Sequence, residues 1–248
     1  MQPWHTVASS CTGKSHLLKG KGNEDACLCA SRLDGVLLLT AADGAGSASH
    51  AAEGSSLVTQ SAISYLSQDT LPQSKKGWES YLLELLYKVR GTLREHADSL
   101  SLSPHAFSST LLLVIISELF IAALQLGDGA IIVQEKEGMR LLTKPYHGRY
   151  PSETVFVSSE GYMDRVSVSV IGTDSVLGLA LITDGLEPVA TEQKTSQPFT
   201  PFFEPLFNFV SKEPSSYKAS LAITDFLKSE RISSRTRDDK TLMLALRQ

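Results

Sequence analysis

The sequence predicts an α+β fold, and three observations lead to that prediction. Its 248 residues are 42% hydrophobic and 20% charged, which is typical of a globular protein with a sizeable core. Predicted strands occur in clusters separated by pairs of helices, instead of alternating with single helices as in a parallel α/β protein. The chain has no internal repeat, low-complexity tract or clear linker, so we expect a single domain over residues 1–248.

The first predicted elements are a β-hairpin and two helices. Strands at 24–31 and 35–42 flank an Asp-Gly pair at 34–35, and Asp-Gly is a strong signal for a tight hairpin turn. Residues 49–67 are predicted to be helical because apolar side chains recur near helical spacing. Residues 78–97 form a second, amphipathic helix with a row of leucines along one side.

Strands dominate the middle of the chain. They are expected at 108–116, 119–126, 129–135, 139–143, 165–171 and 177–183. The most apolar stretch, 111–126, is short for a membrane span and has Ser117 and Glu118 at its centre, so two strands joined by a tight turn are the better interpretation. Residues 144–164 are polar and rich in Tyr and Ser, which predicts a long loop or flap.

The last part of the chain is predicted to contain one helix and one strand. A Pro- and Phe-rich segment, 198–210, is interpreted as a connection. A helix at 216–229 and a closing strand at 240–246 follow it.

Charge and cysteine content narrow the class of protein. The net charge of −4 and the absence of a basic stripe argue against nucleic-acid binding. Three cysteines are too few for a disulfide framework, and Cys27 and Cys29, on one face of a strand, are interpreted as buried thiols and not as zinc ligands. No secretory signal or membrane span is evident, so we expect a soluble cytoplasmic protein.

Acidic residues stand at the ends of five predicted strands. They are Glu24 with Asp25, Asp43, Asp128, Asp184, and Asp238 with Asp239. For any one of them an ordinary turn is the simpler explanation, but neighbouring strands would bring all five to one rim. Clustered carboxylates raise one another's pKa unless cations neutralise them, and carboxylates with a backbone carbonyl suit Mg²⁺ or Mn²⁺. Gly44 would let its main-chain oxygen approach such an ion.

Six short motifs occur along the chain in a recognisable order. They are NEDA (23–26), ADGAG (42–46), SST (108–110), GDG (127–129), TDG (183–185) and DDKT (238–241). Together they resemble the metal-dependent protein serine/threonine phosphatases of the 2C type, over nearly the whole chain. The segments GKSHLLKGKGNEDA, ADGAGSAS and PFFEPLF are closer still to a bacterial branch, the PphC-like stand-alone phosphatases. The resemblance implies a four-layer sandwich in which helices flank two central antiparallel sheets.

By this resemblance, two Mn²⁺ or Mg²⁺ ions are held where the strands end. Asp43 would bridge both ions, the Gly44 carbonyl oxygen would bind one, and Asp184 and Asp238 would complete the catalytic ligands. Asp238 is preferred to Asp239 because the family places this ligand three residues before a threonine.

The resemblance also implies supporting ligands and a mechanism. Glu24 and Asp25 would hold metal-bound waters or lie just behind them, and Asp128 would support, with Asp184, a third and weaker ion found in many members. A metal-bound water would hydrolyse a phosphate monoester without a covalent intermediate.

Two family features are missing from their usual places. Many relatives bind the substrate phosphate through an arginine where this chain has Gly20, and His16 and Lys19 are the candidate replacements. A structural or exposed histidine is an equally good interpretation of His16. Eukaryotic members carry a histidine, thought to protonate the leaving group, where this chain has Ala45; His50 or a metal-bound water is the candidate substitute.

The implied partner is a phosphorylated protein substrate, with a cognate Ser/Thr kinase and a monomeric state as further expectations. The main alternative is a non-catalytic phosphatase-like module that binds phosphoproteins, but such a relative should have lost a ligand, and Asp43, Asp184 and Asp238 are all retained. A P-loop at CTGKS is disfavoured because its first glycine is replaced by Ala8. A nuclease is disfavoured by the lack of basic clusters.

Overall fold

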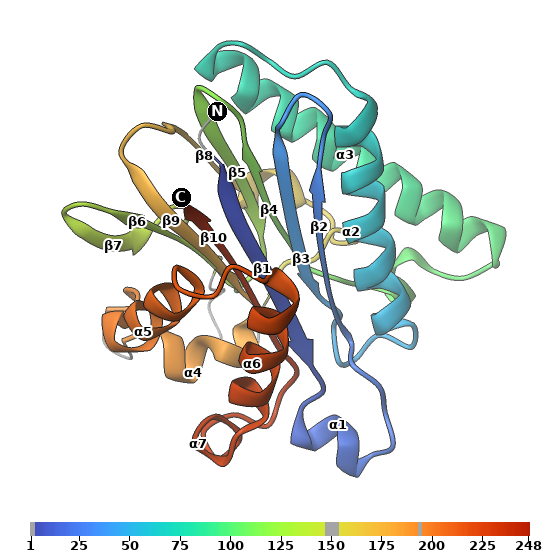
Figure 1. Cartoon of the computed structure of the whole chain (residues 1–248). Coiled ribbons are helices and arrows are strands. Elements are labelled where there is room, and N and C mark those ends of the chain that lie inside the picture. Colours follow the sequence, from blue (N-terminus) through green and yellow to red (C-terminus); the bar gives the residue numbers. More distant parts are fainter. Residues whose placement is uncertain (1–2, 147–153, 193–194) are drawn as a thin grey trace.

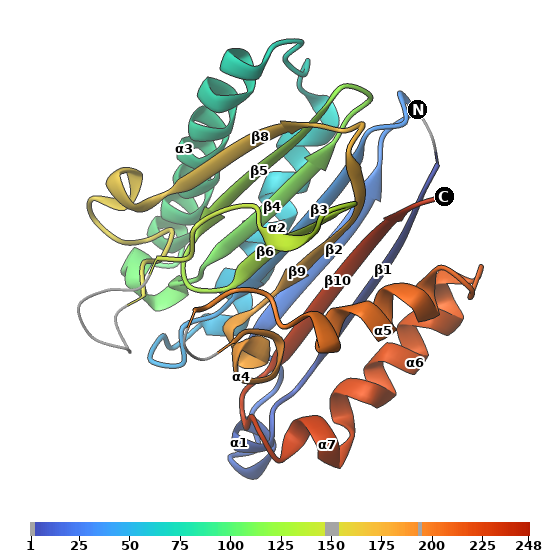
Figure 2. The same cartoon turned by 90° about the vertical axis from the view of Figure 1, so that its left-hand side faces the viewer.

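Two five-stranded antiparallel sheets, stacked face to face, form the centre of the molecule (Figures 1 and 2). The structure, a computed structural model, describes residues 3–146, 154–192 and 195–248. In spatial order, sheet A contains β1 (Trp4–Cys11), β10 (Lys240–Arg247), β9 (Val176–Ile182), β6 (Ala130–Glu135) and β7 (Gly138–Leu141). Sheet B contains β2 (Asp25–Ser31), β3 (Leu37–Asp43), β4 (Leu111–Ile116), β5 (Phe120–Leu126) and β8 (Ser167–Gly172).

Helices cover the outer face of each sheet and complete four layers (Figure 2). Sheet B is covered by α2 (Ala51–Gln68) and α3 (Lys75–Ser99). Sheet A is covered by α4 (Glu187–Ala190), α5 (Thr200–Val210), α6 (Ser216–Lys228) and α7 (Glu230–Ser233). The short helix α1 (Lys14–Leu18) joins β1 to β2, and three 3-10 helices lie in loops: η1 (Pro104–Phe107), η2 (Tyr162–Arg165) and η3 (Asp184–Leu186). The predicted α+β class and four-layer order are confirmed.

The central strands are apolar on both faces because each face packs against another layer. In β4, Leu112, Val114 and Ile116 face sheet A, whereas the alternating residues Leu111, Leu113 and Ile115 face the helices. Strands buried on both faces read as continuous apolar runs, which is why the sequence shows one here. The two sheets are thereby packed against each other through apolar side chains.

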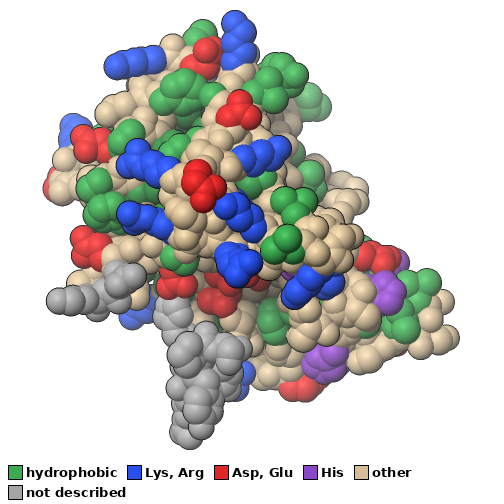
Figure 3. Space-filling view, turned by 90° about the horizontal axis from the view of Figure 1, so that it is seen from below, with side chains coloured by type: hydrophobic (Ala, Val, Ile, Leu, Met, Phe, Trp, Pro, Cys, Tyr) green, Lys and Arg blue, Asp and Glu red, His purple; other side chains and the backbone are tan. Residues whose placement is uncertain are grey.

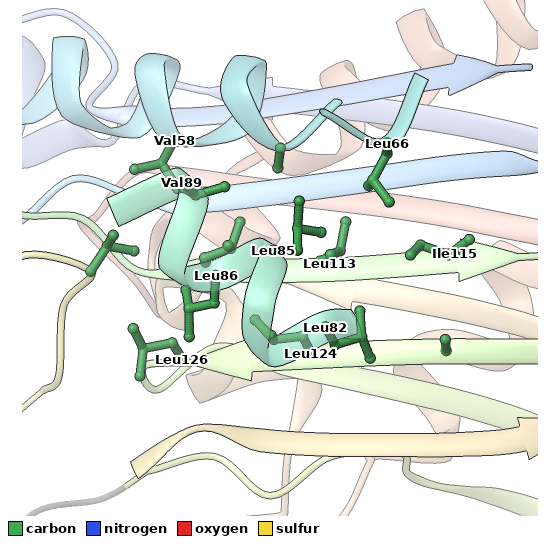
Figure 4. Close-up of a cluster of buried hydrophobic side chains, with 14 of the residues drawn as sticks. Val58, Leu66, Leu82, Leu85, Leu86, Val89, Leu113, Ile115, Leu124 and Leu126 are labelled. Atoms are coloured by element: carbon green, nitrogen blue, oxygen red, sulfur yellow. The ribbon is translucent and has the colours of Figure 1, made fainter. Parts of the chain in front are cut away.

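The helices on sheet B are attached through a leucine-rich core (Figure 4). Its labelled members are Val58 and Leu66 of α2, Leu82, Leu85, Leu86 and Val89 of α3, and Leu113, Ile115, Leu124 and Leu126 of the sheet. All ten are at most 1% exposed. Burying one such side chain contributes about 1.5–3 kcal/mol, so this layer supplies a large part of the folding free energy.

The segment 198–210, predicted as a connection, instead contains the helix α5. Phe202, Phe203, Leu206, Phe207 and Val210 recur at helical spacing and are buried against sheet A. Pro205 lies inside the helix, where its missing N–H costs about 3 kcal/mol. Burial of five large apolar side chains outweighs that cost. The sequence prediction gave more weight to the prolines and therefore missed the helix.

The chain begins with a strand that the sequence analysis did not predict. Strand β1 precedes the predicted hairpin and pairs antiparallel with β10 along its whole length, from Trp4 opposite Arg247 to Cys11 opposite Lys240. Its alternation is hidden because polar Ser9 occupies a buried position, where its hydroxyl lies 2.7 Å from that of Thr224 in α6. The helices α1, α4 and α7, of four or five residues each, are too short to show a helical period.

Part of the predicted flap, 144–164, can be compared with the structure. Residues 147–153 lie outside the described residues. Residues 154–161 are a loop, as predicted, but Val155 and Val157 are fully buried in the core beneath α3. This half of the segment is therefore anchored to the core.

The prediction of two buried thiols is wrong for Cys29. Cys27 is partly buried between the sheets, whereas Cys29 is exposed, with its Sγ 3.4 Å from the Thr6 hydroxyl. The two side chains share a face as predicted, but β2 is an edge strand and its outer half is not covered. Within the described ranges, no helix has both the length and the apolar character to cross a membrane.

Candidate active site

Five strand ends from both sheets meet at one end of the sandwich. Asp43 ends β3, Asp25 begins β2, Asp128 lies in the turn between β5 and β6, Asp184 follows β9, and Asp238 precedes β10. Four of them, all except Asp25, line a cleft of about 410 Å³, which we call the acidic cleft. Figure 3 views the molecule from below and shows acidic side chains set back in a hollow, with Lys and Arg side chains nearby. The predicted convergence of distant acids is confirmed.

The SST motif fixes the backbone at Asp43. The Asp43 N–H donates to Thr110 Oγ1 at 2.8 Å, and the Asp43 carbonyl oxygen accepts from the Thr110 N–H at 2.9 Å and from Ser109 Oγ at 3.0 Å. The N–H and the carbonyl oxygen of Asp43 are therefore both hydrogen-bonded to the two residues that precede β4. The side chain alone is directed to the cleft.

Gly44 is also required by close packing. A Cβ atom at this position would lie 2.4 Å from the Ala51 carbonyl oxygen and 2.8 Å from the Glu24 carbonyl oxygen. The Gly44 N–H donates to that Glu24 oxygen at 3.1 Å. Gly44 thus allows the start of α2 to pack closely against the strand ends. The sequence analysis explained Gly44 only by the approach of an ion and did not predict this packing role.

Asp25 is a buried carboxylate held by two threonines. Its Oδ2 accepts from Thr183 Oγ1 at 2.8 Å and from Thr241 Oγ1 at 2.7 Å, and antiparallel pairing places it directly opposite Asp43. Burial raises the pKa of Asp25 to about 6, although both threonine hydroxyls act in the opposite direction. Asp25 therefore lies beside Asp43, buried outside the lining of the cleft.

The acids of the cleft disfavour one another's ionised forms. Burial raises the pKa of Asp43 well above its usual range, and the carboxylates of Asp184 and Asp25 raise it further. Burial likewise raises the pKa of Asp184 to about 8, with added repulsion from Asp128 and Asp238. A bound cation would favour the ionised forms of Asp43 and Asp184, since it offsets both the burial and the repulsion.

Two buried oxygen atoms of the cluster have no hydrogen-bond donor among the described residues. They are Asp128 Oδ1 and Glu24 Oε2, and the second lies 3.4 Å from His16 Nε2 without hydrogen-bond geometry. The other oxygen of Asp128 accepts from Thr154 Oγ1. Buried polar atoms normally have partners, so these oxygens are suited to a bound ion or to waters held by one. The donor set therefore fits hard divalent cations.

The two adjacent acids before β10 have different surroundings. Asp238 lines the cleft and is exposed. Asp239 is 2% exposed; it accepts from the Gly13 and Glu24 N–H groups, each at 2.6 Å, and lies 2.8 Å from His16 Nδ1. The predicted preference for Asp238 agrees with this placement, because the oxygens of Asp239 are already engaged. Ligand atoms of His16, Asp238 and Asp239 nevertheless lie within 4.8 Å of one another, which is close enough for all three to contact one ion.

His16 and Lys19 both line the acidic cleft, and His50 does not. His16, in α1, is hydrogen-bonded through Nδ1 to Asp239, and this contact fixes the position of its ring. Lys21 pairs with Glu24 Oε1 at 2.9 Å. The His50 ring packs against Phe107 at a centroid distance of 5.0 Å, and its Nδ1 lies 2.9 Å from Ser49 Oγ. The structure therefore gives no support to His50 as a substitute proton donor.

Some site residues were missed by the sequence analysis. Asp239 was set aside, yet it connects α1, the start of β2 and the start of β10. Lys240 is 1% exposed and donates from Nζ to the Asp238 carbonyl oxygen at 3.3 Å, which places a cation directly behind the acids. No local signal in DDKT indicates this burial, because lysine is almost never fully buried unless it is paired.

We expect the metal-free protein to lose stability as the pH rises from about 4 to about 8. The pKa of Asp25 rises from 3.8 to about 6 on folding, and that of Asp184 from 3.8 to about 8, so the folded state binds more protons within this window. Thermal unfolding in EDTA should give a melting temperature that falls from pH 5 to pH 8. Asp184→Asn should make the melting temperature depend less on pH. A melting temperature that rises from pH 5 to pH 8 would contradict the raised pKa values of Asp25 and Asp184.

Comparisons with known proteins agree with this arrangement. A family profile described as Protein phosphatase 2C matches residues 12–228. Serine/threonine-protein phosphatase 3 of Escherichia coli (strain K12) is 30% identical over 250 residues, which cover 98% of this chain and 98% of that protein.

Solved structures share the fold. The crystal structure of a bacterial serine phosphatase bearing an arginine-to-alanine mutation superposes with a TM-score of 0.70 at 16% identity, over 100% of both chains. Serine/threonine phosphatase Stp1 from Staphylococcus aureus superposes with a TM-score of 0.67 at 16% identity, over 99% of this chain and 95% of that one. At such identities these likenesses show the fold, and the profile and the E. coli relative show the family that the six motifs predicted. The chain therefore belongs to the protein phosphatase 2C family of metal-dependent protein serine/threonine phosphatases.

Proposed function

We propose that this phosphatase hydrolyses phosphoserine and phosphothreonine monoesters of proteins by direct attack of water, with two divalent ions bound in the acidic cleft. The observation that supports it most strongly is the convergence of Asp43, Asp184 and Asp238 from three strands and both sheets. The family's dependence on metal and the unfavourable ionisation of the unneutralised acids agree with that proposal.

The proposed catalytic ligands are Asp43, Asp184 and Asp238, with the Gly44 carbonyl oxygen beside them. Asp43 lies among the other acids, since the carboxylates of Asp184, Asp25 and Asp128 all act on it, and it would help to hold both ions. When bound, the ions would act as Lewis acids that lower the pKa of water to about 7 and offset charge on the phosphoryl group.

Three further acids are proposed to support the ions. Glu24 and Asp25 lie beside Asp43 and would hold waters of the metal shell. Asp128, whose Oδ1 has no hydrogen-bond partner among the described residues, would support a third and weaker ion together with Asp184. The Thr154 hydroxyl donates to the other oxygen, Oδ2, of Asp128 and so fixes the orientation of this carboxylate.

His16 and Lys19 are the proposed contacts for the substrate phosphate. Both line the acidic cleft, and Asp239 fixes the ring of His16. Phosphate binding by a lysine and a histidine would replace the bidentate contact of the arginine found in many relatives. Removal of either side chain should raise KM for p-nitrophenyl phosphate more than it lowers kcat.

The experiment that tests the function measures release of phosphate from p-nitrophenyl phosphate and from a phosphothreonine peptide. We expect activity with Mn²⁺ or Mg²⁺, none in EDTA, and recovery when the ion is restored. Hydrolysis that persists after complete chelation would overturn the proposal. The substrate is proposed to be a phosphoprotein modified by a partner kinase, and the protein to act as a single-domain monomer.

A further inference from the structure

An apolar groove lies on the outer face of the helices that cover sheet A. It has a volume of about 540 Å³ and runs between α5 and α6, which lie side by side (Figures 1 and 2), to α7. Its walls include Phe199, Pro205 and Phe209 from α5 and its N-cap, Ala222 and Phe226 from α6, and Ile232 from α7. We call it the α5–α6 groove.

The groove leaves large aromatic side chains in contact with solvent. Phe199 is 40% exposed and Phe209 is 39% exposed. Exposed apolar surface is unfavourable unless something covers it, and contiguous patches of this kind mark binding sites. Aromatic residues, together with arginine, are also the residue types that contribute most to protein interfaces.

Two arginines stand at one end of the groove. Arg231 and Arg235 line its α7 end, and neither guanidinium makes an ion pair or a side-chain hydrogen bond within the described ranges. The neighbouring acid, Glu230, instead pairs with Lys14 of α1 at 3.0 Å. The groove therefore offers an apolar floor with a positive end, and its ligand should be apolar with a negative end.

We propose that the α5–α6 groove binds a segment of a protein partner that is apolar along one face and acidic at one end. An amphipathic helix placing residues i, i+3, i+4 and i+7 into an apolar groove is a recurrent mode of recognition. The groove follows helix α5, whose 11 residues span about 16 Å, or three helical turns of a partner. The guanidinium groups of Arg231 and Arg235 would then receive the carboxylates in charge-assisted hydrogen bonds.

The positive end of the groove lies close to the acidic cleft. Arg235 precedes Asp238 by three residues, so their Cα atoms are at most about 11 Å apart. The intervening segment is also fixed to α1, because the Arg237 carbonyl oxygen accepts from the N–H and from the hydroxyl of Ser15, at 2.8 and 2.5 Å. A partner docked in the groove would therefore be held beside the cleft, although binding itself does not depend on the metal chemistry.

The test is a charge swap with defined peptides. The probe is a 14-residue amphipathic peptide, labelled with a neutral fluorophore, with leucines at helical spacing and two glutamates at one end; a second peptide has lysines in place of the glutamates. By fluorescence anisotropy we expect wild type to bind the glutamate peptide, and Arg231→Glu with Arg235→Glu to weaken it about 10-fold or more. The same variant should gain affinity for the lysine peptide.

Matched variants separate this site from general charge effects. Lys76→Glu with Lys136→Glu changes the net charge equally at exposed positions, one in α3 and one in the turn between β6 and β7, and should leave binding unchanged. Ala222→Trp, at an exposed position of the groove wall, should block both peptides by filling it. Hydrolysis of p-nitrophenyl phosphate should be unaffected in every one of these variants. Absence of saturable binding to wild type, or binding that is insensitive to the arginine replacements, would overturn the proposal.

Discussion

Asp43→Asn is expected to lower metal-dependent phosphatase activity by about 1,000-fold or more. Lewis-acid stabilisation by bound ions supplies several kcal/mol, and each 1.36 kcal/mol corresponds to a factor of ten in rate. Asp43 is the acid proposed to contact both ions, so its replacement weakens both. The measurement is kcat/KM for p-nitrophenyl phosphate at saturating Mn²⁺.

The same substitution should stabilise the protein in the absence of metal. The raised pKa of Asp43 comes from burial and from repulsion by Asp184 and Asp25, and a neutral amide removes both causes. Thermal unfolding in EDTA at pH 8 should therefore give a higher melting temperature for Asp43→Asn than for wild type. Activity within tenfold of wild type, or a lower melting temperature in EDTA, would show that Asp43 is a structural acid.

Gly185→Ala is expected to destabilise the fold by about 3 kcal/mol or more, because it forces a backbone shift at the start of β10. A Cβ atom at this position would lie 1.8 Å from the Asp239 carbonyl oxygen and 3.0 Å from its carbonyl carbon. The clash is with backbone, so no side-chain rotation can relieve it. Asp238 and Asp239 would be displaced together, and metal-dependent activity should fall as well.

Thermal denaturation measures the effect of Gly185→Ala, with Gly91→Ala as the matched control. A Cβ atom at Gly91, inside helix α3, would meet nothing within 4 Å, so its alanine variant should be as stable as wild type or more so. For a chain of this length, about 3 kcal/mol corresponds to a fall of roughly 6–12 °C in melting temperature. A Gly185→Ala protein with the same melting temperature as wild type would contradict the close packing of Gly185 against Asp239.

The sequence predicts the elements whose patterns are set by burial on a regular face. The strands β3, β4, β5 and β9 and the helices α2 and α3 have continuous apolar runs or helical periods, because whole faces of them are buried. Strand β1 was missed because Ser9 is polar and yet buried. Its hydroxyl is hydrogen-bonded to that of Thr224, so the polar residue did not mark an exposed position. Helix α5 was missed because Pro205 argues against a helix, and this local signal was given more weight than the helical spacing of the apolar residues.

The candidate site was predictable to the extent that its parts are strand ends. Each acid could be found at the end of a strand, and the order of the motifs indicated that they meet. Their meeting depends on the stacking of two sheets, which local patterns do not encode. The role of Asp239 depends on three donors from Gly13, Glu24 and His16, all more than 200 residues away in the chain, so it could not be read locally.

The central claim is that carboxylates from both sheets jointly bind divalent ions, and anomalous diffraction from a crystal soaked in Mn²⁺ tests it most directly. The account predicts two strong manganese peaks in the acidic cleft, within bonding distance of Asp43, Asp184 and Asp238. A soaked crystal with no manganese there, or with manganese bound only by His16, Asp238 and Asp239, would contradict it.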